Sequence, residues 1–110
     1  MVKLFEVTYT EDADAAIDEY LSLGDQELIS TLESWLCGLK LKGSVLGTPL
    51  TSADLTDSGK FDYTGFFKIG FSHDGEDYRI IYRCIDKKVE VVKIANRDVV
   101  YKSPPIAEIK

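Results

Sequence analysis

Basic side chains recur at alternate positions in three apolar segments near the C-terminal end of the 110-residue chain. Alternate residues of a β-strand point to the same face, so strands at 63–72, 77–85 and 88–96 would gather these side chains on one face. The set comprises Lys68, Arg79, Arg83 and Lys93, followed by Arg97 just past the last strand and Tyr101 four residues later. Mutual repulsion among such cations costs energy unless a partner supplies negative charge. The pattern indicates an anion-binding surface, and an ordinary solvated face that includes Glu90 and Asp98 would explain it equally well.

The other face of the same three strands is almost entirely apolar. Its predicted members are Phe67, Ile69, Phe71, Tyr78, Ile80, Tyr82, Val92 and Ile94. Such a face needs a second layer to exclude water from it. Turns at 73–75, which contain Asp-Gly, and at 86–87 are short enough to join the strands as an antiparallel meander.

The second layer is predicted in the first half of the chain. A strand at 3–9 precedes a helix that begins after Thr10, carries acidic residues in its first turn and ends at Gly24. Asp25 caps a second helix, predicted at 26–41, whose wide apolar stripe includes Trp35 as a core residue. A two-residue link makes the two helices an antiparallel hairpin.

Two segments lack a hydrophobic period. Residues 42–60 contain several glycines and a proline and are predicted to form a long loop, and Pro104-Pro105 keep a tail at 104–110 extended. The predicted order is therefore βααβββ, an α+β fold in which an antiparallel sheet packs on an α-hairpin. We expect one domain at 1–103, followed by the tail.

The net charge of −6 is unevenly distributed. Residues 1–60 hold 4 basic and 11 acidic residues, a balance of −7, whereas residues 61–110 hold 9 basic and 8 acidic residues, a balance of +1. An acidic protein does not bind free nucleic acid tightly through phosphate charge alone. A local cationic patch on the three C-terminal strands is compatible with this balance.

Other candidate residues favour structural roles. His73 is predicted to be an exposed turn residue rather than a catalytic base, and Cys37 and Cys84 are predicted to be two buried free thiols. One histidine and two separated cysteines give no zinc-binding constellation, so no metal or other cofactor is expected. The sequence contains neither an apolar stretch long enough to span a bilayer nor an N-terminal apolar leader, so a cytoplasmic protein without membrane contact is expected.

Most of the chain resembles the RelE/ParE superfamily of small bacterial and phage toxins, the toxic halves of type II toxin–antitoxin pairs. The stretches that carry the resemblance are PLTSADL, GFFKIGF, EDYRIIYRCIDKKVEVVKI and ANRDVVYK. The most specific are a Gly-aromatic-x-Lys strand, a Tyr-Arg-hydrophobic-hydrophobic-Tyr strand and a short Arg…Val-Tyr segment. The fold of the superfamily has the same order of elements as the one predicted above.

The resemblance implies one of two activities and a partner. RelE-like members cleave messenger RNA, mostly on the ribosome and without metal, and ParE-like members poison DNA gyrase; an antitoxin protein neutralises either. RNA cleavage needs deprotonation of the 2′-hydroxyl, cations around the pentavalent phosphate and a proton for the leaving 5′-oxygen. By position, Lys68, Arg79, Arg97 and Tyr101 correspond to the catalytic set, with Arg83 and Lys93 as further substrate contacts.

Two departures from the RelE-like pattern keep other interpretations open. Gly70 stands where RNA-cleaving members often carry a second basic residue, and the residues after Tyr101 do not form a clear basic helix. Arg79 could also be a surface arginine paired with Glu90. A messenger-cleaving toxin, a gyrase-poisoning toxin and a non-catalytic binding module with the same fold therefore remain three alternatives.

Overall fold

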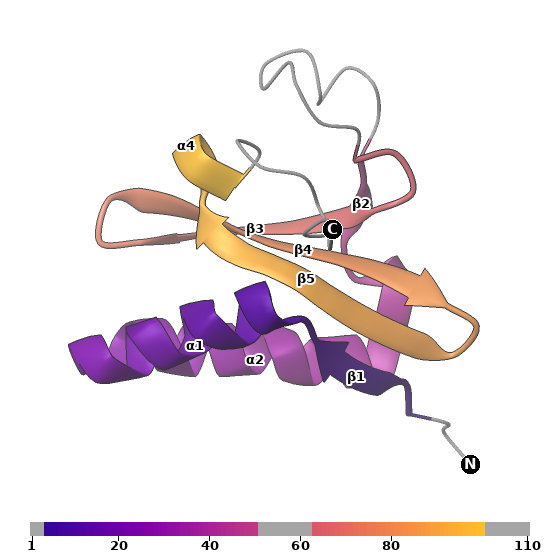
Figure 1. The fold of residues 1–110 in the computed structure, drawn as a ribbon, viewed down its shortest axis with the longest axis horizontal. Coiled ribbons are helices and arrows are strands. Elements are labelled where there is room, and N and C mark those ends of the chain that lie inside the picture. The colour runs from indigo at the N-terminus through magenta and orange to yellow at the C-terminus, as the bar shows by residue number, and fades with distance from the viewer. Residues whose placement is uncertain (1–3, 51–62, 101–110) are drawn as a thin grey trace.

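The computed structural model describes residues 4–50 and 63–100 and has two main layers, a five-stranded sheet and a helical hairpin that covers one sheet face (Figure 1). The strand order is β1-β5-β4-β3-β2, with β1 and β5 parallel and the other neighbours antiparallel. The predicted α+β architecture is confirmed. The elements are β1 (Glu6–Tyr9), α1 (Glu11–Leu23), α2 (Gln26–Lys42), the short 3-10 helix η1 (Gly43–Val45), β2 (Thr48–Pro49), β3 (Phe67–His73), β4 (Glu76–Ile85), β5 (Lys88–Asn96) and α4 (Arg97–Val100).

Both helices begin at the predicted capping residues. The Thr10 side-chain oxygen accepts a hydrogen bond from the Ala13 amide at 3.3 Å, and an Asp25 carboxylate oxygen accepts one from the Leu28 amide at 3.2 Å. Each bond satisfies a backbone donor that the first turn of a helix leaves unpaired. Gly24 ends α1 in the left-handed conformation, with φ of 73°, as its lack of a side chain allows.

The predicted meander is present, but its first strand starts later than expected. Residues 63–66 form a turn instead, in which the Phe66 amide donates to the Tyr63 carbonyl at 3.1 Å. Gly65 has φ of 92°, a conformation that a regular strand does not contain. The β3–β4 turn has positive φ at both Asp74 and Gly75, 54° and 81°, as the tight primed hairpin turns require.

The predicted loop at 42–60 is only partly irregular within the described residues. Thr48 and Pro49 pair with β3 as the edge strand β2, and the Tyr82 hydroxyl holds the segment before it. This hydroxyl accepts from the Gly47 amide at 2.8 Å and donates to the Gly43 carbonyl at 3.2 Å. Burial raises the pKa of Tyr82 to about 12, so the hydroxyl keeps the proton that it donates. Residues 51–62 and the predicted tail at 104–110 lie outside the described residues.

The sheet is packed on both faces. The larger core lies between the sheet and the helices and includes Leu32, Leu39, Ile69, Ile80 and Tyr82. A second buried cluster lies on the opposite face, and its members are Leu50, Tyr63, Ile81, Val92 and Val100. We call this opposite side the front face; Figure 1 shows α4 on it and the helical hairpin on the other side.

A β-bulge overturns the predicted position of Val92. Ile81 pairs with Lys93 and Tyr82 pairs with Val91, so Val92 is an extra residue in β5. A bulge shifts the alternation of side chains by one residue. Val92 therefore packs in the front-face cluster rather than against the helices, while Ile94 lies in the larger core as predicted.

The predictions for the cysteines and for Trp35 have mixed outcomes. Both cysteines are free, but Cys37 is exposed on α2 and Cys84 is only half-buried, so the expectation of two buried thiols is wrong. Cys37 lies outside the apolar stripe of α2, which explains its exposure. Trp35 packs against the larger core as predicted.

Candidate functional site

The predicted basic residues of the three strands lie on the front face. Lys68 of β3 and Lys93 of β5 are both paired with Ile81 of β4, so the three form a row across the sheet. Arg79 occupies the next position on this face of β4, opposite Gly70 on one side and Ala95 on the other. The cations thus surround an apolar centre, the front-face cluster, rather than forming a continuous basic surface.

Arg79 occupies the space that Gly70 leaves open. An added Cβ at Gly70 would lie 2.8 Å from Nη1 of Arg79 and 3.2 Å from its guanidinium carbon. The same Nη1 donates a hydrogen bond to the Tyr78 carbonyl at 3.0 Å. The half-buried guanidinium therefore lies over Gly70, at the position where a second basic side chain is absent.

Arg83 rather than Arg79 pairs with Glu90. Nε and Nη2 of Arg83 each lie 2.7 Å from the same Glu90 carboxylate oxygen, and the guanidinium lies 5.7 Å from the centre of the Phe66 ring. The alternative of an Arg79–Glu90 pair is wrong because Arg83 and Glu90 are directly paired across β4 and β5. The charge of Arg83 is thus largely balanced within the protein.

Lys93 is buried, with a relative exposure of 7%. Its ammonium donates to the Val100 carbonyl at 3.2 Å and lies 5.9 Å from the centre of the Tyr63 ring. Burial lowers the pKa of Lys93, and the negative charge of Asp12 partly opposes this shift. The ammonium lies inside the protein beneath α4, not on an open surface where a substrate would meet it.

The segment that carries the remaining candidates is held on the front face by two donors. The Tyr63 hydroxyl also donates to the Val100 carbonyl, at 2.9 Å, so this one acceptor binds both Tyr63 and Lys93. A four-residue helix has little intrinsic stability, and these contacts with buried Val100 position it. Arg97 is exposed at the start of α4, two residues after the partner of Arg79, and Tyr101 lies just outside the described residues.

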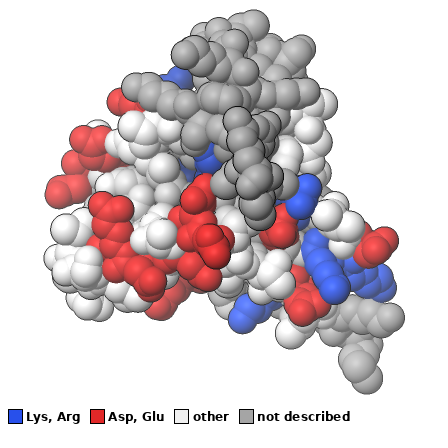
Figure 2. Space-filling model, in the orientation of Figure 1, with Lys and Arg blue, Asp and Glu red and all other residues white. Residues whose placement is uncertain are grey.

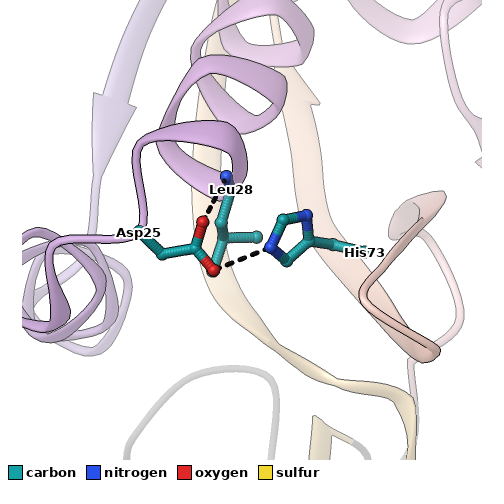
Figure 3. A network of polar contacts seen from close by, with 3 residues as sticks. All are labelled: Asp25, Leu28 and His73. Atoms are coloured by element: carbon teal, nitrogen blue, oxygen red, sulfur yellow. Dashed lines mark hydrogen bonds and ion pairs between the residues drawn. The ribbon is translucent and has the colours of Figure 1, made fainter.

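His73 is not the exposed turn residue that the sequence predicted. It is the last residue of β3, its side chain is 12% exposed, and its Nε2 lies 2.7 Å from an Asp25 carboxylate oxygen (Figure 3). Hydrogen bonds from His73 and then from the Leu28 amide lower the pKa of Asp25. The alternation that places Ile69 and Phe71 toward the helices could have predicted this side, because His73 has the same parity. The pair links the hairpin tip to the α1–α2 turn, away from the front face.

Sequence reasoning also missed Tyr63 as part of the site. The residue was assigned to the start of a strand, whereas it is buried in the turn before β3 and contacts α4.

Among the described residues, no group of three or more histidine, cysteine or acidic side chains could hold a metal ion. The helices of this part of the chain include none long and apolar enough to cross a membrane.

Comparison with solved structures decides which fold this is. The model aligns with a mutant of the Escherichia coli toxin RelE in the free state at a TM-score of 0.63 and 14% identity, covering 88% of this chain and 87% of that one. The chain has the RelE toxin fold. The RelBE2 toxin–antitoxin complex of Mycobacterium tuberculosis aligns at a TM-score of 0.58 and 18% identity, covering 86% of this chain and 99% of that one.

A third similar structure is the YoeB–YefM complex from Staphylococcus aureus, with a TM-score of 0.58 and 15% identity over 83% of this chain and 94% of that one. No protein-family model matches the sequence, and the comparison with curated proteins found no match. The RelE toxin fold expected from the sequence is therefore confirmed by structure. Sequence identities this low show a shared fold and carry no information on the activity of this chain.

Proposed function

We propose that this protein is the toxin of a type II toxin–antitoxin pair, acting in the cytoplasm as an endoribonuclease that cleaves messenger RNA on the ribosome. The observation that carries the proposal is the guanidinium of Arg79 held over Gly70, on the front face of a RelE-type sheet. The similarity to two toxin–antitoxin complexes supports an antitoxin partner.

In the proposed reaction, the 2′-hydroxyl of the RNA gives its proton to water and its oxygen bonds to the adjacent phosphorus. The bond from phosphorus to the 5′-oxygen breaks, and that oxygen leaves with a proton. Extra negative charge develops on the phosphate oxygens in the transition state, where fixed cations stabilise it most. Arg79 and Lys68 would bind these oxygens from β4 and β3, and Arg97 from the start of α4. Tyr101 would donate the proton to the 5′-oxygen.

The internal contacts of the other two cations limit their proposed roles. Arg83 would contact RNA only through the part of its guanidinium that Glu90 does not bind, because both of its described nitrogen contacts go to that carboxylate. Lys93 would act through α4, since its ammonium holds the Val100 carbonyl. We therefore propose Lys93 as a positioning residue for Arg97 and Tyr101 rather than as a direct contact.

The test uses the purified chain with translating ribosomes and a defined messenger RNA. Arg79→Ala and Arg97→Ala are expected each to reduce cleavage by about 100-fold, the effect of removing one transition-state donor. Lys88→Ala is the matched control, because Lys88 is an exposed strand cation, 68% accessible, with only a 3.9 Å contact to Glu6. Equal activity of the wild type and both arginine variants would refute the proposed site.

Gyrase poisoning is the second candidate, and one observation favours it. Arg83 is paired with the Glu90 carboxylate and Lys93 is buried against the Val100 carbonyl, which leaves less positive charge for RNA. A protein target requires less positive charge than RNA does. Double-strand DNA breaks without messenger cleavage after expression would support this candidate. Harmless expression with intact messenger RNA would instead support a non-catalytic binding module.

A further inference from the structure

The strand β5 has an open edge beyond its pairing with β1. The parallel pairing covers Lys88 to Val91, and at Thr10 the chain turns into α1. The Thr10 amide then donates to the Val91 carbonyl at 3.0 Å, and its hydroxyl donates to the Val92 carbonyl at 2.8 Å. Within the described residues, β5 continues to Asn96 with β4 on one side and no strand on the other. Such an edge can pair with an extended segment of another protein.

A groove of about 350 Å³ follows this open edge, between α1 and α4. Ala15 and Ala16 form its wall on the α1 side, and their small side chains leave room for a backbone to approach. Val99 contributes an apolar surface on the α4 side and is 50% exposed. The groove therefore combines an unpaired strand edge with exposed apolar surface, the two features that strand addition uses.

The two sides of the groove differ in charge. Asp12 and Glu19 line it on the α1 side, and α1 as a whole, EDADAAIDEYLSL, holds five acidic residues and no basic ones. Figure 2 shows acidic side chains gathered over the part of the view that α1 occupies. Lys93 also lines the groove and its charge partly offsets that of Asp12, but its ammonium is bound to the Val100 carbonyl and Glu19 adds a second carboxylate, so negative charge remains in excess in the groove.

The arrangement of the layers determines which side chains such a segment would carry. The helix α1 lies on one face of the sheet and α4 on the other, and side chains of an added strand alternate between those faces (Figure 1). One set would meet Asp12 and Glu19, and the other would meet Val99. Complementarity therefore requires basic residues at one parity and apolar residues at the other.

We infer that this groove binds an extended partner segment with alternating basic and apolar residues, added as a strand to the open edge of β5. The inference rests on the proposed toxin role only for the identity of the protein that carries the segment, a neutralising partner. The predicted chemistry depends on the groove alone, so the inference is testable without any assay of toxicity or RNA cleavage.

The experiment selects ten-residue peptides from a random displayed library on the purified full-length chain. Enriched peptides are expected to alternate Lys or Arg with Val, Leu or Ile. Their affinity, measured by fluorescence anisotropy at 0.15 M salt, is expected to fall at least tenfold with the double variant Asp12→Lys, Glu19→Lys. The double variant Glu11→Lys, Asp18→Lys is the matched control, since it makes the same charge change seven residues apart on α1, one position away from the groove. Its affinity is expected to stay within twofold of the wild type.

A second probe separates strand addition from simple charge attraction. The best selected peptide is synthesised with N-methyl groups on the backbone amides of one parity and, separately, of the other. One of the two forms is expected to lose binding, because it removes the donors that face β5, while both retain every charge. Enrichment of acidic peptides, no enrichment, equal weakening by both double variants or equal binding of both methylated forms would each overturn the inference. None of these outcomes affects the cleavage assay above.

Discussion

The two faces of the sheet are built differently, although both contain buried residues. The face under α1 and α2 is apolar except at its end, where His73 pairs with Asp25, and Ile69, Ile80 and Tyr82 lie in one continuous core. The front face places a small apolar cluster among cations, with Ile81 at its centre. The comparison shows that one face primarily serves stability, whereas the other combines stability with the positioning of charge.

Ile80 and Ile81 give the most direct test of this difference, because they are adjacent, both are fully buried and they point to opposite faces. We expect Ile80→Ala to cost about 4 kcal/mol of unfolding free energy and Ile81→Ala about 2.5 kcal/mol, since the front-face cluster is smaller and can relax into the space. Urea unfolding of both variants measures the two values. A cost below about 0.5 kcal/mol for Ile81→Ala would show that the front-face cluster is not a core.

Gly70→Ala tests whether the position of Arg79 matters for activity independently of stability. The new methyl group would lie 2.8 Å from Nη1 of Arg79 and would displace the guanidinium. We expect a loss of RNA cleavage of about 10-fold from this displacement. The unfolding free energy should change by less than about 1 kcal/mol, because a flexible side-chain end can move aside. Unchanged cleavage would separate Arg79 from the chemistry.

Lys93→Met tests the contact that holds α4. The variant loses a hydrogen bond to the Val100 carbonyl but also removes a buried charge, so we expect a net change in unfolding free energy within about 1.5 kcal/mol. The amides of α4 should exchange faster with solvent. Unaltered exchange in α4 would show that Tyr63 alone is sufficient to hold it.

The same variant should alter the dependence of stability on alkaline pH. The folded-state pKa of Lys93 is below its ordinary 10.5, so the unfolded chain binds more protons between these two values. Stability contributed by this group therefore rises as pH increases through the lowered pKa toward 10.5. Lys93→Met should lack that part of the rise, which unfolding curves collected across the range would detect.

Asp25→Asn should have the smallest effect on stability, and it acts at the edge of the sheet face that α1 and α2 cover. Its pKa lies below the ordinary 3.8 in the folded protein, so its stabilising contribution is present above 3.8 and is lost as pH falls through the lowered value. Asparagine keeps the capping oxygen but does not titrate. Acid unfolding of the variant should therefore lack this part of the pH dependence. Asp18→Asn, on the exposed surface of α1, is the control, and an identical profile for both variants would assign no special role to Asp25.

The sequence predicted the covered face well and the front face less well, for physical reasons. The hydrophobic period was sufficient to predict where α1, α2, β4 and β5 lie. The ends of the helices were predicted from Thr10, Gly24 and Asp25, because capping acts locally. The bulge at Val92 was missed because it is defined by how β5 pairs with β4, and this long-range pairing leaves no signal in the local sequence. The start of β3 was missed because Tyr63 alternates like a strand residue but is buried by contact with α4.

The sequence predicted which basic residues lie at the candidate site, but not which groups of the protein they contact. Alternation placed Lys68, Arg79, Arg83 and Lys93 on the front face, yet it could not show which cation Glu90 binds. The burial of Lys93 depends on α4 folding back over the sheet, a tertiary feature without a local signal. The roles of these side chains, and of Tyr101 in the undescribed segment, stay predictions that the cleavage assay tests.

The bulge in β5 makes the strand tolerant of a change in length. Val91 and Val92 are identical neighbours that face opposite sides, so deleting either one leaves the same sequence, VEVKIAN, at the end of the strand. That shortened strand alternates regularly and would keep Glu90, Lys93 and Ile94 on their present faces. The local bend that a bulge introduces would disappear with the extra residue. We therefore expect that deleting one of the two valines changes the approach of α4 to the sheet and leaves the pairing of β5 with β4 otherwise intact.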